Sequence, residues 1–478
     1  MEQRTSNPLI VVASLAVTVT MALLVAWQWA VAATTVDAAP AIAATADPTI
    51  ELATPVMSFR RAPGVLSRSL TVTQFRIQLA TLLDRVGPGS CASVAVDGTV
   101  VSSKQGDLPV IPASNMKLVV AATALEVLGP SFTFRTSVFG DVDAAGVVLG
   151  DLALLGGGDP LLTTDDWLAN NTQTYREINT TRLESLADAR VGRGVTRVNG
   201  RVLGDASRYD DEYFHPTWDP DLHGREAGPI DALMVNDSWL GNSFVGLRDV
   251  AVDPGLRAAE VFTELLRERG IPVGQGSAAG VSEIGNELAG IDSQPLSAIV
   301  QEMLLTSDDN TAEVLVKEMG SQSGTGGSTE AGVEVVLDTL AGWGMPLLGV
   351  TLVDGSGLSR DNFVTCELLV EILHRRGPTS VLGSGLPVAG TSGTLIDEFI
   401  GSPVAGKLKA KTGSLTDVKA LAGYLPAPGG DTIEFAVVLN EPGAKEAEFY
   451  QRVWDALAVS LVTYPSSASS AELVPRST

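Results

Sequence analysis

Residues 114–128 (SNMKLVVAATALEVL) constrain the fold more than any other segment, because they predict a helix that is apolar on nearly every face. The helix is expected to end at Gly129-Pro130, a pair typical of a helix C-terminus. A helix of this kind has to be enclosed by other elements, so we expect it in the middle of a domain. Lys117, near its start, is then a charged side chain on an otherwise apolar helix.

Ser114 and Lys117 form an S-x-x-K pattern at the start of this helix. Positions i and i+3 share a helix face about 5–6 Å apart, so the lysine amine can reach the serine hydroxyl. A serine needs a nearby base to act as a nucleophile, and burial favours the neutral lysine that can serve as one. Alone, the pattern is also compatible with a simpler interpretation, in which Ser114 caps the helix and Lys117 is a surface residue.

A second segment with suitable chemistry is Lys411-Thr412-Gly413, which is expected on a strand. The glycine allows a substrate backbone to approach closely, and the lysine and threonine can bind a carboxylate. The backbone N–H groups of Ser414 and Ser114 can together form an oxyanion hole. An ordinary turn is the alternative for this segment.

A third segment, Thr306–Asn310 (TSDDN), opens another predicted helix, and an ordinary helix cap is its alternative. The order of the three segments is what indicates function: S-x-x-K on a buried helix, a polar turn before a second helix, then K-T-G on a strand. Together they predict a hydrolase that forms an acyl-enzyme, with Ser114 as nucleophile and Lys117 as its base.

The composition excludes several other functions. A formal net charge of −24 leaves no basic face for nucleic acid. No local pair of histidines or cysteines is present for zinc, and we expect neither a metal nor another cofactor. For Cys91 and Cys366, a disulfide and two buried thiols both remain open.

The N-terminal region predicts export. Leu9–Ala33 has no charged residue, and its 25 residues exceed the roughly 20 that a helical membrane span needs. Arg4 favours a cytoplasmic N-terminus. We interpret residues 1–36 as a signal peptide or membrane anchor, with an uncleaved anchor preferred, so the remainder is expected in the cell envelope, outside the cytoplasm.

The rest of the chain divides by pattern. An Ala/Thr/Pro linker is expected over residues 37–65 and a disordered tail over 464–478. Mixed helix and strand patterns cover 66–132 and 251–463, and a β-rich insertion with Gly and Asp turns covers 133–250. The predicted fold class is therefore α/β (α+β) with a β-rich inserted domain or domains.

Four individual elements are predicted within this body. They are a helix over 72–85, a strand over Cys91–Val96, a hairpin over 419–440 with a Pro-Gly-Gly turn, and a final helix over 445–462.

These motifs resemble those of the class C low-molecular-mass penicillin-binding proteins, the D-alanyl-D-alanine carboxypeptidase/endopeptidase family. The resemblance covers roughly residues 66–463 and includes GGGDP at 156–160, GPIDALMVND at 228–237 and VDGSGLSRDN at 353–362. It implies a transpeptidase-like domain interrupted by β-rich insertions. It also implies cleavage at D-alanine in peptidoglycan stem peptides, and acylation by penicillins and other β-lactams.

Carried over to this sequence, the resemblance implies that Ser114 is acylated, that Lys117 deprotonates it and that Ser307 relays protons to the leaving amine. The third residue of the second motif is expected to be asparagine, but strict counting places Asp309 there, with Asn310 next to it. An aspartate would favour the charged form of the lysines, weaken Lys117 as a base and repel a substrate carboxylate. We therefore prefer Asn310 in this role over Asp309.

The resemblance further implies substrate-binding roles for four residues. Lys411 and Thr412 are expected to hold the terminal carboxylate, and Ser414 to donate its N–H to the oxyanion. Arg360 is expected to bind the side-chain carboxylate of the stem peptide.

Two other functions remain compatible with the sequence. One is a β-lactamase or esterase on the same scaffold. The other is a catalytically weak scaffold that binds the cell wall, which the irregularity at Asp309 leaves open. Carboxypeptidase and endopeptidase activities use the same groups, so the sequence is compatible with both.

Overall fold

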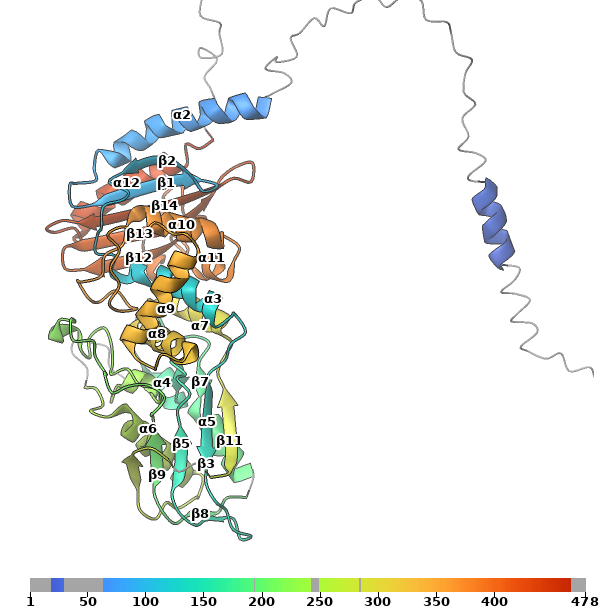
Figure 1. Ribbon diagram of the computed structural model, residues 1–478, viewed down its shortest axis with the longest axis vertical. Coiled ribbons are helices and arrows are strands. Elements are labelled where there is room, and N and C mark those ends of the chain that lie inside the picture. The colour runs from blue at the N-terminus through green and yellow to red at the C-terminus, as the bar shows by residue number, and fades with distance from the viewer. Residues whose placement is uncertain (1–18, 30–62, 193, 242–248, 283–284, 466–478) are drawn as a thin grey trace, which may run out of the picture. The chain divides into compact units, whose positions relative to one another are not determined.

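The computed structural model of the protein describes residues 19–29, 63–192, 194–241, 249–282 and 285–465 (Figure 1). It divides into two compact units, Met1–Pro63 and Gly64–Thr478.

In the first unit, residues 19–29 are helical. Among all described residues, no helix is both long and apolar enough to reach across a bilayer. Most of the expected span Leu9–Ala33 lies outside the described residues, as do nearly all of the expected linker at 37–65 and residues 466–478 of the expected tail.

The second unit is built around an antiparallel five-stranded sheet. Its strand order is β12-β13-β14-β1-β2, so the C-terminal strands lie at one edge and the N-terminal ones at the other. The strands are β1 (Cys91–Val96), β2 (Thr99–Lys104), β12 (Lys409–Leu415), β13 (Val418–Pro426) and β14 (Thr432–Asn440). The strand predicted over Cys91–Val96 and the hairpin predicted over 419–440 are both confirmed.

Helices cover both faces of this sheet (Figure 1). On one face, α2 (Pro63–Leu83) and α12 (Ala447–Leu461) pack against apolar strand residues such as Val94 and Phe435. These helices correspond to the ones predicted over 72–85 and 445–462. The first of them begins earlier than expected, at a proline that the opening turn of a helix tolerates well.

The opposite face of the sheet is covered by helices that surround α3 (Met116–Val127). Every residue from Met116 to Leu125 is buried, which confirms that the apolar segment forms an enclosed helix. The other described helices of this unit are α4 (Asp165–Asn170), α5 (Leu183–Gly192), α6 (Pro254–Glu268), α7 (Leu296–Thr306), α8 (Asp309–Ser323), α9 (Thr329–Gly342), α10 (Cys366–Arg376) and α11 (Val381–Gly385).

A second, mixed sheet with strand order β10-β9-β5-β3-β11 forms a separate apolar core with α5 and α6. Its strands are β3 (Arg135–Phe139), β5 (Leu152–Leu155), β9 (Val202–Asp205), β10 (Ser277–Ala279) and β11 (Glu287–Asp292). Two short parallel pairs, β4 (Val147–Val148) with β8 (Arg197–Val198) and β6 (Leu162–Thr163) with β7 (Thr181–Arg182), accompany it.

The second sheet extends beyond the insertion expected over 133–250. Strand β11 pairs antiparallel with β3 along its length, and β10 pairs parallel with β9. The chain therefore completes this sheet after α6, and a boundary at residue 250 would separate paired strands.

Cys91 and Cys366 form a disulfide, with their Cα atoms 5.9 Å apart. The bond joins the start of β1 to the first residue of α10, and both cysteines are fully buried. It closes a covalent loop across a sequence separation of 275 residues.

Replacing both cysteines by alanine is expected to lower the free energy of unfolding by about 2–5 kcal/mol, because the unfolded chain regains the freedom of a long loop. Urea unfolding under non-reducing conditions measures the loss. The two single variants serve as controls, since each removes the same bond and should lose nearly as much as the double variant. Superimposable transitions for wild type and the double variant would contradict the prediction.

Candidate active site

Ser114 lies in a short 3-10 turn, Ala113–Asn115, that leads directly into α3. Ala113 has a positive φ of 46°, so the backbone turns sharply just before the serine. The turn packs against β12, where a Cβ on Gly413 would lie 2.8 Å from the Pro112 carbonyl oxygen. Glycine at this position lets the strand pass close to the serine.

Lys117 lies one turn further along α3, and its side chain is fully enclosed. Its Nζ is 3.1 Å from Ser114 Oγ, as the i, i+3 spacing predicts. The same nitrogen donates to Asp309 Oδ1 at 2.6 Å and to the Ser356 carbonyl at 2.9 Å. An ammonium group has three protons, and these three acceptors can take all of them.

Asp309, the first residue of α8, is the acid in this group. Its side chain is only 9% exposed, and burial raises its pKa while the Lys117 ammonium acts in the opposite direction. The pair therefore holds its charge in the interior through a direct hydrogen bond.

Asn310 does not reach the lysines, so our preference for it over Asp309 is wrong. Its amide oxygen accepts the Gly228 N–H at 3.0 Å, and its nitrogen lies 3.8 Å from Met234 Sδ. The reason is helical geometry, because successive residues of α8 point about 100° apart around the helix axis. Only one of the two neighbours can face Lys117.

Ser307 and Lys411 form a second hydroxyl–amine pair near Asp309. Ser307 ends α7 in the left-handed conformation, with φ 70°, and its hydroxyl accepts a hydrogen bond from Lys411 Nζ at 2.8 Å. Lys411 also donates to the Thr412 carbonyl at 3.0 Å. Burial lowers the pKa of Lys411 well below its ordinary value, and the nearby Lys117 charge adds to this effect.

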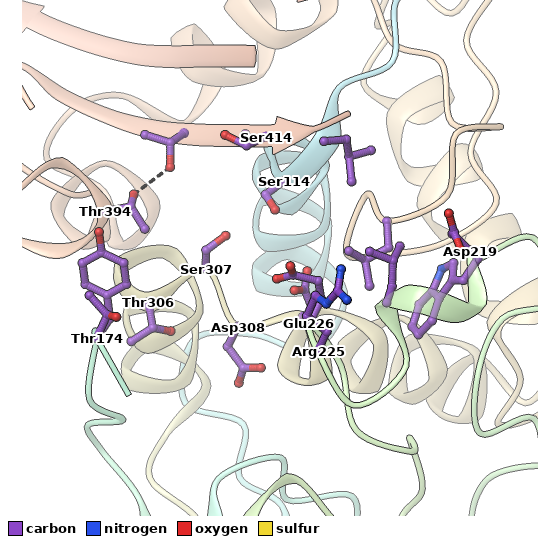
Figure 2. Close-up of a pocket in the computed structure, with 18 of the residues that line it drawn as sticks. Ser114, Thr174, Asp219, Arg225, Glu226, Thr306, Ser307, Asp308, Thr394 and Ser414 are labelled. Carbon is purple, nitrogen blue, oxygen red and sulfur yellow. Dashed lines mark hydrogen bonds between the residues drawn. The ribbon is translucent and has the colours of Figure 1, made fainter. Parts of the chain in front are cut away.

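The remaining predicted binding residues line the same opening. Thr412 Oγ1 donates to Thr394 Oγ1 at 2.7 Å, the contact drawn as a dashed line in Figure 2. Ser414 is exposed and accepts a hydrogen bond from Lys419 at 2.9 Å. Arg360 donates to the Thr416 carbonyl at 2.7 Å.

The cleft in front of Ser114 has a volume of about 1060 Å³. Figure 2 shows Ser114, Ser307 and Ser414 bordering one space, with Asp219, Arg225 and Glu226 on a loop that lies to one side. These last three residues, and Gln173–Glu177, belong to the segment between β6 and α6. One wall of the cleft therefore comes from the expected insertion.

Three partly or fully buried acids line another part of the cleft. Glu177 accepts from the Trp167 indole nitrogen at 3.2 Å, and burial, with the Asp308 charge nearby, raises its pKa to about 7. Burial also raises the pKa of Asp308 and, most strongly, that of Glu302. Within the described chain, no donor reaches Glu302 Oε2. Glu177 and Glu302 belong to no motif that the sequence singles out, whereas Asp308 lies within the TSDDN segment.

The arrangement can support acyl transfer. It combines a hydroxyl at the start of a helix, an amine within hydrogen-bond distance, and a second hydroxyl bonded to a second amine. Among the residues that the structure describes, no cluster of three or more His, Cys, Asp or Glu side chains is placed to hold a metal ion.

Comparisons with known proteins agree with this geometry. The family model described as "D-Ala-D-Ala carboxypeptidase 3 (S13) family" matches residues 80–245 and 244–461. Two similar proteins are a D-alanyl-D-alanine carboxypeptidase of Actinomadura sp. (29% identical; 82% of this chain, 85% of the relative) and carboxypeptidase DacB of Mycolicibacterium smegmatis (30%; 84% and 85%). The crystal structure of penicillin binding protein 4 from Haemophilus influenzae has the same fold, with a TM-score of 0.69 and 21% identity over 81% of this chain and 99% of that one.

Replacing Glu177 by glutamine is expected to change how stability depends on pH. Because its pKa is raised to about 7, the folded protein binds more protons than the unfolded chain above about pH 4.5. The free energy of unfolding therefore falls as the pH rises from about 4.5 toward 7. The melting temperature of Glu177→Gln should fall less between pH 5 and pH 8 than that of wild type, by about 2–4 °C for each kcal/mol removed.

Differential scanning calorimetry across this range measures the difference. Glu448→Gln, which changes an exposed acid on α12, is the control and should follow wild type. If the melting temperature of Glu177→Gln changes with pH as that of wild type does, the raised pKa of Glu177 does not affect stability, and the prediction is wrong.

Proposed function

The chain belongs to the D-Ala-D-Ala carboxypeptidase 3 (S13) family, and from this we propose that it is a penicillin-sensitive serine DD-peptidase acting on peptidoglycan stem peptides. We propose that it works through an acyl-enzyme at Ser114. The observation that most directly supports this proposal is the 3.1 Å contact, at the cleft, between Ser114 Oγ and the Nζ of the enclosed Lys117.

In the proposed acylation step, Ser114 Oγ attacks the carbonyl carbon of the penultimate D-alanine while Lys117 in its neutral form takes the hydroxyl proton. The charge that develops on the carbonyl oxygen is stabilised by the backbone N–H groups of Ser114 and Ser414. The C–N bond then breaks as the proton that Lys117 took passes to the leaving amine through the hydroxyl of Ser307, which is held by Lys411. Water then attacks the ester carbonyl while neutral Lys117 takes one of its protons. That proton passes to Ser114 Oγ when the ester C–O bond breaks, which restores both Ser114 and the neutral lysine.

The proposed carboxylate site explains why Lys411 is placed where its charge is disfavoured. In the free protein, burial and Lys117 lower its pKa, so the site has an incompletely compensated positive charge. A substrate carboxylate beside Lys411 and Thr412 would supply the missing negative charge and favour the ammonium form. Arg360 also lines the cleft, where it donates to the Thr416 carbonyl. We propose that it binds the side-chain carboxylate of the stem peptide.

Peptidoglycan lies outside the cytoplasmic membrane, so the proposed substrate places the catalytic unit there. Leu9–Ala33 would direct this export, either as a cleaved signal or as an anchor that holds the protein at the membrane. The linker at 37–65 would then separate the membrane from the folded unit.

Incubation with a fluorescent penicillin is expected to label the wild-type protein covalently and to leave Ser114→Ala unlabelled. The label is measured on a denaturing gel and located by peptide mass. Ser384→Ala, which changes an exposed serine on α11, should label as wild type does. A labelled Ser114→Ala would exclude this nucleophile, an unlabelled wild type would exclude the acyl-enzyme, and a label lost within seconds would favour a β-lactamase.

Asp309→Asn is expected to slow acylation about tenfold or more. The 2.6 Å charged contact with Asp309 helps to hold Lys117 Nζ beside Ser114, and a neutral amide holds it less firmly. Second-order acylation rates provide the measurement. Asn310→Asp, which changes the neighbouring position facing Gly228, is the matched control and should stay closer to the wild-type rate. A wild-type rate in Asp309→Asn would show that the pair does not position the base.

A further inference from the structure

Asp354 begins the loop from residue 354 to residue 362 and is completely buried. Its Oδ1 accepts from the Gly357 N–H at 2.9 Å and from Asn362 Nδ2 at 2.6 Å. Its Oδ2 accepts from the Ser359 N–H at 2.7 Å and from the Trp218 indole nitrogen at 2.8 Å. An ionised carboxyl group can only accept hydrogen bonds, so these four donors occupy both of its oxygens.

One of these donors connects Asp354 to the candidate active site. The N–H of Gly357 and the carbonyl of Ser356 belong to the same peptide unit. That carbonyl accepts the hydrogen bond from Lys117 Nζ at 2.9 Å, while the N–H donates to Asp354 at 2.9 Å. Because a peptide unit is planar, a carboxylate that holds its N–H also fixes the direction of its carbonyl.

The peptide is also fixed against the turn that carries the nucleophile. Gly357 has φ 85°, and a Cβ at this position would lie 2.0 Å from the Ala113 carbonyl oxygen. Another residue would therefore displace the loop from the backbone just before Ser114. The Ser356 carbonyl and Ser114, which both contact Lys117 Nζ, are thus held at a fixed distance from each other.

A lysine amine sits at the end of a flexible four-carbon stem, so its position is set by the acceptors that it binds. We propose that Asp354 is a positioning residue for Lys117, acting through the Ser356–Gly357 peptide. The carboxylate fixes the peptide and polarises it, which strengthens the carbonyl as an acceptor. This inference rests on the proposed function, in which Lys117 is the base for Ser114.

Asp354 also connects this peptide to the wall of the cleft. Trp218, which donates to it, is 4% exposed and lines the cleft. Its neighbour Asp219 lines the same cleft and is labelled in Figure 2. Thr217 donates to Ser359 Oγ at 2.6 Å, so the same segment holds the loop at a second point. A displacement of this wall can therefore reach Lys117 through one side chain and one peptide.

The test compares Asp354→Asn with wild type in the full chain. Lysines labelled with ¹³C at Cε are observed by NMR at one pH, and the Lys117 signal is assigned with Lys117→Met. Asp354→Asn should move the Lys117 signal away from its wild-type chemical shift, because the carbonyl that holds Nζ is no longer fixed in direction. The rate of acylation by the fluorescent penicillin should fall about tenfold or more, with the final extent of labelling unchanged.

Asp205→Asn is the matched control for loss of a buried carboxylate. Asp205 lies in the second sheet and accepts the Ser282 N–H at 2.7 Å and the Ser207 N–H at 3.0 Å. This variant should melt at a lower temperature while the Lys117 chemical shift and the acylation rate stay at wild-type values. A role for Asp354 in folding alone predicts that Asp354→Asn behaves in the same way, and that result would overturn the proposal.

If Asp354→Asn does not fold, Trp218→Phe takes its place, since it removes one donor to Asp354 and keeps most of the packing. A loss of about threefold or more in the acylation rate supports the proposal, and a wild-type rate overturns it. Wild-type protein that is not acylated at all would refute the proposed function. The chemical shift of the Lys117 signal in Asp354→Asn would then still decide whether Asp354 positions it.

Discussion

A lysine side chain enclosed in the protein interior sets the main constraint on this structure. Moving an ammonium group out of water costs several kcal/mol, which is recovered only when acceptors surround it. Lys117 finds three of them, on the turn that leads into its own helix, on α8 and on the loop before α10. Helix α3 can therefore carry this charge only where the other two elements meet it, and that meeting point is where Ser114 faces the cleft.

The sequence predicted those parts of the fold that depend on neighbours in the chain. The buried helix over 114–128 follows from an apolar surface without a polar face, and the hairpin over 419–440 follows from alternation around a Pro-Gly-Gly turn. The limits of the second sheet could not be obtained this way. Strand β11 pairs with β3 only after the chain has passed through the other three strands of this sheet, β5, β9 and β10, and through α6.

The same distinction holds within the candidate site. The contact of Ser114 with Lys117 spans three residues and was predicted, whereas Asp309 and Ser356 are 192 and 239 residues from Lys117. Which of Asp309 and Asn310 faces Lys117 depends on the orientation of α8 about its own axis. That orientation depends in turn on where the helix begins, after its N-cap Asp308. A motif gives the order of side chains along the chain, while their direction depends on the packing of the helix.

The disulfide has a consequence for the integrity of the protein in an environment that contains proteases. Its loop runs from β1 to α10 and includes Ser114, Ser307 and the whole second sheet. A single cut anywhere inside this loop, including the exposed turns of the second sheet, leaves both pieces covalently joined. Such a nicked molecule keeps its nucleophile, its second hydroxyl and Lys411 on one covalent assembly, because the strand that carries Lys411 follows α10 without interruption.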